Sequence, residues 1–317
     1  MSTDKRAKGI QAALASAMLL GIVPVFGKQA ILVGFTPLAV VALRTSIATI
    51  LLSVLMLIYK RQFFYIFPVG LYGCILAGLV NGLGSILFYT ALGRINAGIG
   101  QLLYSFYPLF AAIWLLLDRQ TITRMTFFRL VLSLPGVVLL LTTGTDQVDL
   151  IGAGLMIGSA VLYALHLIIN QRVLFEVPAP TVTFYTLLSM AVTVILAFLI
   201  FKPALPTTDA PWWPILGMGI LTFGSRLTLF YGVKNLGGMQ TALLGLGELI
   251  VTVALSHIWL GEQMSAWQWV GAGLLCSSLL LVGFDHYPPE KRHSTGWLSW
   301  LNPPQITGSE FPWHQSP

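Results

Sequence analysis

Long, nearly continuous apolar runs dominate the chain, and short segments that often contain Pro, Gly or Asn separate them. Examples are the runs from Ala12 to Ile22 and from Leu155 to Ile169. A helix of about 20 apolar residues crosses the hydrocarbon core of a bilayer. Strands of a membrane barrel would instead show segments of about 10 residues with alternating polarity. The pattern therefore predicts an all-α polytopic membrane protein.

The apolar runs divide into ten expected transmembrane helices. Their ranges are Gly9–Val33, Pro37–Tyr59, Phe67–Leu92, Asn96–Leu117, Met125–Leu141, Leu150–Asn170, Ala179–Phe201, Trp213–Val233, Gly238–Leu260 and Ala266–Val282. The connections between them are short, no soluble domain is inserted, and a polar tail follows Phe284.

Composition supports a membrane protein and excludes two other classes. Of the 317 residues, 56% are hydrophobic and 9% are charged, against about 25% charged in a typical soluble domain. The net charge of +6 comes from basic residues in short connections, without the basic stripe that nucleic-acid binding requires. Cys74 and Cys276 both lie in apolar spans, which indicates small buried side chains and no disulfide. No cofactor and no metal ion are expected.

The distribution of Lys and Arg predicts the orientation in the membrane. With the amino terminus inside, 12 of the 17 basic residues lie on the inner side. Lys28, Arg94 and Lys202 lie on the outer side, while Arg44 and Arg226 lie within spans. We therefore expect both termini in the cytoplasm and the chain in a plasma or inner membrane.

The two halves of the chain share residues at a nearly constant distance. Ser16-Ala17 and Pro37 recur as Ser159-Ala160 and Pro180, 143 residues later, and Gly82 and Leu87-Phe88-Tyr89 recur as Gly224 and Leu229-Phe230-Tyr231, 142 residues later. These matches divide the chain into repeats at residues 9–142 and 150–283 and a cytoplasmic tail at residues 284–317. Since five helices per half is an odd number, the second repeat inserts inverted relative to the first. Inverted repeats are a recurring design of transporters.

The ten helices in two halves resemble the drug/metabolite transporter superfamily, in particular its EamA-type members, over about Gly9 to Gly283. The stretch Leu260-Gly261-Glu262 is similar to a motif of that family, and Arg44 resembles an arginine of its second helix. The first half departs from the pattern, with Asp118-Arg119 where Gly-Glu is expected. The resemblance implies a central cavity, walled mainly by the third, fourth, eighth and ninth helices, and export or exchange of small metabolites.

Two ionisable residues at bilayer depth are the first candidates for a site, because such groups usually face an interior or a cavity. Of 11 acidic residues, Glu248 alone falls in the middle of a span, and Arg226 lies on the preceding helix. Their distances from the intervening turn correspond to depths of about 18 and 15 Å, so they can meet near the midplane. They form either a structural ion pair or a substrate site in which Glu248 is the proton-coupling group.

Polar and aromatic side chains on neighbouring spans complete the expected substrate site. Gln101, Tyr104 and the adjacent Tyr107 share one part of the fourth helix, and an amphipathic ring suits a cavity for organic molecules. Asn81, Tyr89 and His166 are added from the third and sixth helices. The alternatives are ordinary packing for the aromatic residues and for Arg44, and a buried, hydrogen-bonded histidine with no proton-relay role for His166.

The sequence predicts a secondary transporter, either an exporter or an exchanger, of small organic metabolites that works by alternating access. Amino acids or related amines are preferred, because Arg226 and Glu248 can each bind one end. A nucleotide-sugar or phosphosugar exchanger is the alternative, and it would favour several cations in the cavity. A membrane-embedded enzyme is less favoured, because the spans hold no acidic cluster. The expected partners are the substrate and the lipid bilayer, without nucleic acid, and the chain is expected to be a monomer or homodimer.

Overall fold

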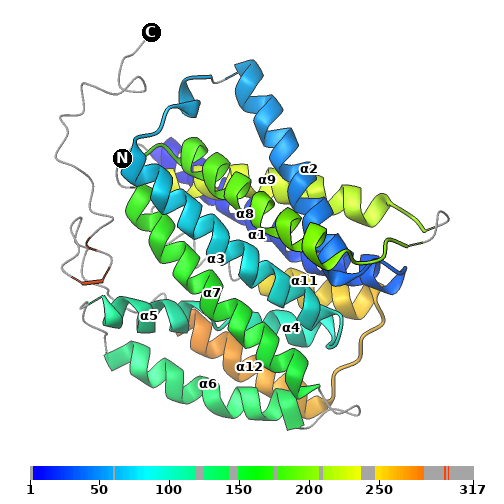
Figure 1. Ribbon diagram of the computed structural model, residues 1–317. Helices are drawn as coiled ribbons and strands as arrows, with labels where there is room; N and C mark the ends of the chain where they lie inside the picture. Colours follow the sequence, from blue (N-terminus) through cyan, green and yellow to red (C-terminus); the bar gives the residue numbers. More distant parts are fainter. Residues whose placement is uncertain are drawn as a thin grey trace.

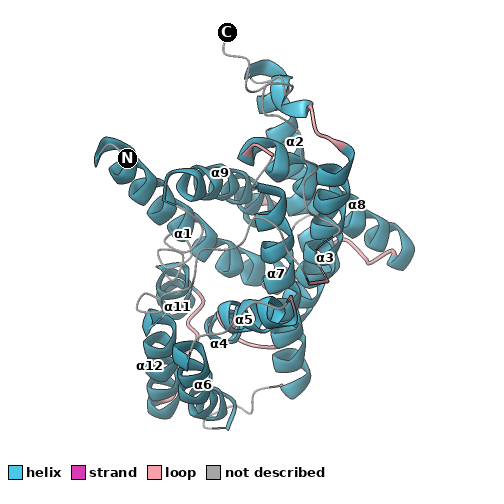
Figure 2. Ribbon diagram, turned by 90° about the vertical axis from the view of Figure 1, so that its left-hand side faces the viewer, coloured by secondary structure: helices cyan, strands magenta, loops and turns pink. Residues whose placement is uncertain are grey.

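The apolar runs become helices in the computed structural model, and its described residues contain no strand (Figure 2). The structure describes residues 3–59, 61–118, 124–142, 149–174, 177–206, 210–236, 247–281, 296–297 and 299. The elements are α1 (Thr3–Leu32), α2 (Pro37–Tyr59), the 3-10 helix η1 (Arg61–Phe64), α3 (Pro68–Leu92), α4 (Ala97–Tyr104), α5 (Tyr107–Leu117), α6 (Arg124–Thr142), α7 (Leu150–Leu174), α8 (Ala179–Phe201), α9 (Trp213–Leu236), α11 (Gly247–Trp259) and α12 (Ala266–Leu280).

Six stretches of the described helices are long and apolar enough to cross a membrane by length and composition. They are residues 7–32, 37–58, 68–92, 97–117, 150–174 and 179–201. Large aliphatic side chains point outward on several helices, and Ile58, Ile200 and Ile258 are 66%, 73% and 78% exposed. Lipid solvates such side chains, whereas helices satisfy their own backbone groups inside it. The chain is an integral membrane protein.

The expected fourth span is not one continuous helix. α4 ends at Tyr104 and α5 begins at Tyr107, with Ser105 and Phe106 in right-handed turn conformations between them. Pro108 has no backbone N–H to donate to the carbonyl of Tyr104, so the regular hydrogen-bond ladder is interrupted there. The expected span Asn96–Leu117 is present as the apolar stretch 97–117, but a break after Tyr104 divides it into two helices.

The helix contacts between the two repeats are reciprocal: the first helix of each repeat packs on the third helix of the other. α1 packs on α9, and α7 packs on α3. α6 and α12, the last helix of each repeat, lie side by side at the edge of the bundle opposite α2 (Figures 1 and 2). α2 with α8 and α4 with α11 complete the pairs of equivalent helices. This reciprocity is the arrangement that two inverted five-helix repeats produce around a pseudo-two-fold axis.

Equivalent serines make a similar hydrogen bond at each of the two reciprocal contacts between the repeats. The Ser16 hydroxyl donates to the Ser225 carbonyl at 3.1 Å, and the Ser159 hydroxyl donates to the Gly84 carbonyl at 2.8 Å. Ser16 and Ser159 are the residues that the 143-residue spacing relates. The weak sequence repeat thus coincides with a repeated contact in three dimensions.

Glycines on α3 allow α8 to approach closely. A Cβ atom added at Gly78 would lie 2.5 Å from the Thr186 carbonyl oxygen, and one at Gly82 would lie 2.9 Å from Thr193. On α7, by contrast, a Cβ at Gly154 would meet nothing within 4 Å. Of these three glycines, the two on α3 are therefore required by helix packing, which is a known use of small residues in membranes.

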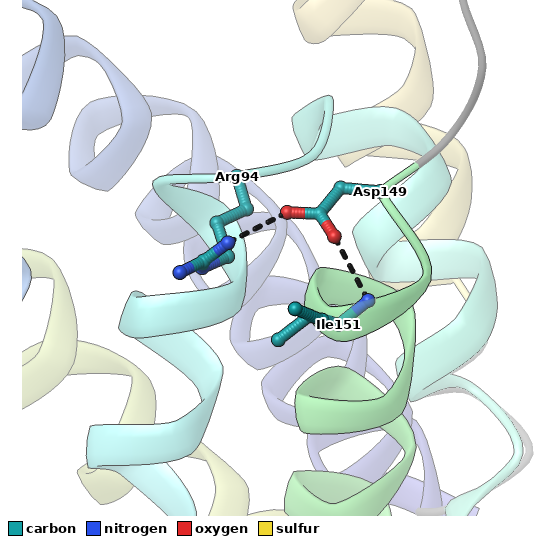
Figure 3. Close-up of polar contacts among 3 residues, drawn as sticks. All are labelled: Arg94, Asp149 and Ile151. Carbon is teal, nitrogen blue, oxygen red and sulfur yellow. Dashed lines mark hydrogen bonds and ion pairs between the residues drawn. The ribbon is translucent and has the colours of Figure 1, made fainter.

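An exposed ion pair joins the two repeats where α3 ends and α7 begins. Arg94 Nη1 lies 2.9 Å from Asp149 Oδ2, and Asp149 Oδ1 accepts the Ile151 backbone N–H at 2.8 Å (Figure 3). Asp149 therefore also caps the amino-terminal end of α7. The hydrogen bond from Arg94 is the main cause that lowers the pKa of the Asp149 carboxyl.

A buried ion pair lies at the opposite end of α7. Arg172 Nη2 donates to Asp118 Oδ2 at 2.7 Å, and the two side chains are 5% and 0% exposed. Nearby, Trp114 Nε1 donates to the Val161 carbonyl at 3.1 Å. These contacts fix the carboxyl-terminal end of α5 against α7.

The expected tail at residues 284–317 lies almost wholly outside the described residues. Gly296, Trp297 and Ser299 are the exceptions. The ring of Trp297 packs on that of Trp114, with centroids 5.8 Å apart.

Candidate functional site

A hydrogen bond between the two repeats lies at the centre of the candidate site. Gln101 on α4 donates from Nε2 to Glu248 Oε1 on α11 at 2.9 Å. The segments Gly98-Ile99-Gly100-Gln101 and Gly245-Leu246-Gly247-Glu248 match at a spacing of 147 residues. Gln101 and Glu248 are thus equivalent positions of the two repeats, and they meet each other at the pseudo-two-fold axis.

The amide oxygen of Gln101 is buried and has no hydrogen-bond partner. Gln101 itself is 3% exposed. Buried polar atoms are nearly always hydrogen-bonded, so one that is not calls for an explanation. Beside the carboxylate of Glu248, it offers a second acceptor to a donor that enters the site.

Aromatic rings line the side of this pair that faces α7. Tyr104, Tyr107 and Tyr163 form a cluster, with ring centroids 5.1 to 6.0 Å apart. Phe88 continues the cluster from Tyr104, and His166 stacks on Tyr163 at 5.6 Å. Tyr163 was not among the residues expected from the sequence. Its position three residues before His166, on the same face of one helix, was the signal available.

A small polar pocket adjoins the aromatic cluster. Its lining residues are Asn81, His166, Asn170, Thr183, Thr186, Leu187 and Arg226. A hydrogen-bond chain runs along one wall, in which the Thr186 hydroxyl donates to Asn170 Oδ1 at 3.1 Å and Asn170 Nδ2 lies 3.2 Å from His166 Nε2. His166 Nδ1 lies 3.0 Å from the Ala77 carbonyl oxygen. His166 is therefore held by both ring nitrogens.

Arg226 lies between the polar pocket and the Gln101–Glu248 pair. It lines the pocket, faces the Tyr163 hydroxyl and lies within electrostatic range of Glu248. The described residues show no ion pair between Arg226 and Glu248, and Glu248 Oε1 accepts from Gln101 instead. The buried Nε of Arg226 has no hydrogen-bond partner. The two charges expected near one depth interact electrostatically, but no ion pair joins them directly.

Tyr89 and Asn81, the two candidates on α3, have different surroundings. Asn81 lines the polar pocket and donates from Nδ2 to Met190 Sδ at 3.3 Å. Tyr89 is buried at 1% exposure and carries the guanidinium of Arg44 over its ring, 4.8 Å from the centroid. Packing was the favoured interpretation of Arg44 from the sequence, and in the structure Arg44 lies beside the site.

The Leu-Gly-Glu motif of the second repeat has a structural task. The carboxylate of Glu262 accepts the backbone N–H groups of Ala97 and Gly98 at 2.7 and 3.0 Å, which caps the start of α4. Lys28 donates to the carbonyls of Leu92 and Ile95 at 2.7 and 2.8 Å, just before that cap. Both residues thereby position the helix that carries Gln101 and Tyr104.

The described residues contain no group of three or more His, Cys, Asp or Glu side chains that could hold a metal ion. What the arrangement can do is bind an organic molecule between rings, amides, one carboxylate and one guanidinium. A polar site that lies between two inverted helical repeats, within the membrane, is characteristic of secondary transporters.

Comparison with known proteins agrees with this class. A model of the EamA-like transporter family matches residues 7–142 and again residues 150–284. The chain belongs to the EamA-like transporter family, with one copy of the family's unit in each repeat.

Two proteins of similar sequence and one solved structure also resemble this chain. An uncharacterized transporter of Synechocystis, sll1319, is 25% identical over 232 residues, which are 68% of this chain and 67% of that protein. The uncharacterized transporter YcbK of Bacillus subtilis is 21% identical over 202 residues, 60% of this chain and 65% of that protein. A solved crystal structure has the same fold, with a TM-score of 0.61 at 16% identity over 90% of this chain and 98% of the other.

Proposed function

We propose that the protein moves small organic metabolites, amino acids first, by alternating access of a site centred on Gln101 and Glu248. The observation that carries this proposal is the 2.9 Å hydrogen bond between equivalent residues of the two repeats. A site on the pseudo-two-fold axis is the one place that keeps its surroundings when the repeats exchange conformations. Each repeat can then open it to one side in turn.

Amino acids fit the polar atoms that line this site. Gln101 Oε1 and the Glu248 carboxylate are acceptors for an ammonium group, and the unpartnered Nε of Arg226 is a donor for a carboxylate. Nucleotide sugars and phosphosugars are the second candidate, and the presence of a second arginine, Arg44, beside the site favours them over amines. The excess of basic residues on one side supports a cytoplasmic location for both termini in a plasma or inner membrane.

Glu248 is the proposed coupling group, because a carboxylate at this depth can exchange a proton as its surroundings change. The groups that face it are Gln101, Arg226, Tyr89, Tyr104, Tyr107 and Tyr163. A substrate that competes for Arg226 removes a positive neighbour from the carboxylate. Proton and substrate occupancy are then linked through the same pair of residues.

Flux into proteoliposomes tests the coupling role. Glu248→Gln keeps the size of the side chain and removes its titration, so we expect pH-gradient-driven uptake of radiolabelled amino acids to be lost while exchange without a gradient continues. The double variant Gln101→Glu/Glu248→Gln is the matched control, since it moves the carboxylate to the equivalent position of the other repeat and should restore a pH response. A well-folded Glu248→Gln protein with wild-type gradient-driven flux would contradict the proposal.

A further inference from the structure

Two arginines beside the site, the buried Arg44 and the half-buried Arg226, each have a buried donor without a hydrogen-bond partner in the protein. Nε of Arg44 and Nε of Arg226 are both buried without a hydrogen-bond partner. Arg44 is 9% exposed, and its other contacts are long, at 3.4 Å to the Thr222 hydroxyl and 3.5 Å to the Ser85 hydroxyl. Leaving a buried guanidinium donor unpaired is costly, so a structural role does not account for both.

The two guanidinium groups lie along the same interface, between α3 and α9. Arg44 contacts Ser85 and Thr222, whereas the polar pocket is lined by Asn81 and Arg226. Asn81 precedes Ser85 by one turn of α3, and Arg226 follows Thr222 by one turn of α9. The two arginines therefore lie one helical turn apart between α3 and α9, and each is within electrostatic range of the other.

Positive and negative side chains are not equal in number around these two guanidinium groups. No carboxylate pairs with Arg44 among the described residues, and the carboxylate of Glu248 is bonded to Gln101. Two guanidinium groups and one carboxylate leave one positive charge in excess. Like charges buried at this spacing repel each other unless an anion lies between or beside them.

We infer that Arg44 and Arg226 together form a subsite for the carboxylate group of the transported molecule. This inference rests on the proposed function and narrows its substrate class to small carboxylates, of which amino acids are one kind and simple amines are not. Guanidinium groups suit this task because their planar donors match the two oxygens of a carboxylate. Arg226 meets the anion from the polar pocket, and Arg44 holds it from the next turn.

The surroundings predict where the rest of the substrate lies. The rings of Tyr104, Tyr107 and Tyr163 adjoin Arg226, so an apolar or aromatic body attached to the carboxylate packs there. An ammonium group on that body can reach the free Gln101 Oε1 and the Glu248 carboxylate. The carboxylate is required in this arrangement, and the ammonium group adds affinity without being required.

A matched set of probes tests this order of requirements on the purified, detergent-solubilised full chain. The probes are 3-phenylpropionate, phenethylamine, phenylalanine, phenylalaninamide and phenyl phosphate, and binding is measured by calorimetry and by the shift in melting temperature. We expect 3-phenylpropionate and phenylalanine to bind, and phenethylamine and phenylalaninamide, which lack the carboxylate, to bind at least about tenfold more weakly.

Variants assign the effect to the two residues. Arg44→Gln and Arg226→Gln should each weaken 3-phenylpropionate binding by about 10- to 100-fold without weakening the binding of phenethylamine. Arg44→Lys keeps the charge and loses the planar fork, and we expect a smaller loss. Arg61→Gln is the matched control, because Arg61 is exposed on η1, bonds to the Leu57 carbonyl at the end of α2 and does not line the polar pocket. If Arg44→Gln does not fold, Arg44→Lys and the wild-type probe series still decide.

The outcomes separate the subsite from the wider proposal. Equal binding of phenethylamine and 3-phenylpropionate, or no effect of either arginine variant, would overturn the subsite even if the protein transports. Preferential binding of phenyl phosphate would overturn the carboxylate assignment in favour of a phosphate. Arginine-dependent carboxylate binding without flux of any probe in proteoliposomes would support the subsite and refute the transport of these probes.

Discussion

Gln101 and Glu248 differ only in an amide for a carboxylate, yet that difference breaks the symmetry of the site. Ser105 and Thr252 follow them by four residues, and each hydroxyl donates back to the carbonyl of its partner, at 2.7 and 3.0 Å. The backbone around the pair is thus built in the same way twice, while one carboxylate serves both repeats. A single acid between equivalent positions limits the pair itself to one exchangeable proton.

The sequence predicts which residues form the site more readily than which of them bond to each other. Glu248, Arg226 and Gln101 stand out because polar side chains are rare at bilayer depth. The choice of partner does not follow from that, because several donors lie within a few ångströms of one carboxylate. Glu248 bonds to Gln101 and not to Arg226, and Tyr163 lies between Arg226 and the other rings without any charge to mark it.

The buried Asp118–Arg172 pair yields a stability prediction at the residue scale. Asp118→Ala leaves Arg172 charged and without this carboxylate in a site where it is 5% exposed, so the free energy of unfolding should fall by about 3–5 kcal/mol. Thermal unfolding in detergent measures the loss. The double variant Asp118→Leu/Arg172→Met removes both charges and should recover much of it. A single variant as stable as the wild type would show that the pair contributes nothing.

The Arg94–Asp149 pair predicts a dependence on pH. The folded pKa of Asp149 is lowered by Arg94, so its stabilising effect is present above the ordinary Asp pKa of about 3.9 and is lost as the pH falls through the lower folded value. Asp149→Asn keeps an N-cap oxygen for α7 and removes the charge. Melting temperatures of the two proteins should differ near pH 7 and converge below about pH 4. A constant difference across that range would exclude the charge as the cause.

At the scale of helices, the apolar pattern predicts well which helices exist and in which order they follow. It predicts poorly where a helix is broken in its interior. The ends of α2 and α8 coincide with the expected ranges Pro37–Tyr59 and Ala179–Phe201. The break after Tyr104 was missed because Pro108 is itself part of an apolar run, and apolarity carries no information on a missing N–H. The residues 237–246 of the expected ninth span lie outside the described residues.

The α3–α8 contact gives a prediction with an internal control. Gly78→Ala places a methyl group 2.5 Å from the Thr186 carbonyl oxygen, so the two helices must separate, and we expect a loss of about 1–3 kcal/mol in stability. Gly154→Ala makes the same change on α7 in open space, where alanine gains helix propensity of up to about 1 kcal/mol. Melting temperatures should fall for the first and hold or rise for the second. Equal shifts would indicate that close approach is unimportant.

At the scale of the molecule, the repeats determine both the fold and the position of the site. Reciprocal packing of α1 on α9 and of α7 on α3 brings α4 and α11 together on the axis. The sequence predicts the duplication from a spacing of 142 and 143 residues, whereas the site pair follows a spacing of 147. Connections of different length shift the spacing between helices, so a single offset cannot align every element of the two halves.

Two charged clusters lie at opposite ends of the bundle, Asp118 with Arg172 at one end and Lys28 with Glu262 at the other. Arg172 and Asp118 bind each other directly, whereas Lys28 and Glu262 are each held by backbone groups of α3 and α4. If the contacts at the two ends of the bundle were identical, opening either end would require the same free energy. Here one end is held by a buried ion pair and the other by hydrogen bonds from charged side chains to backbone groups, so opening each end breaks a different kind of contact, whatever the substrate.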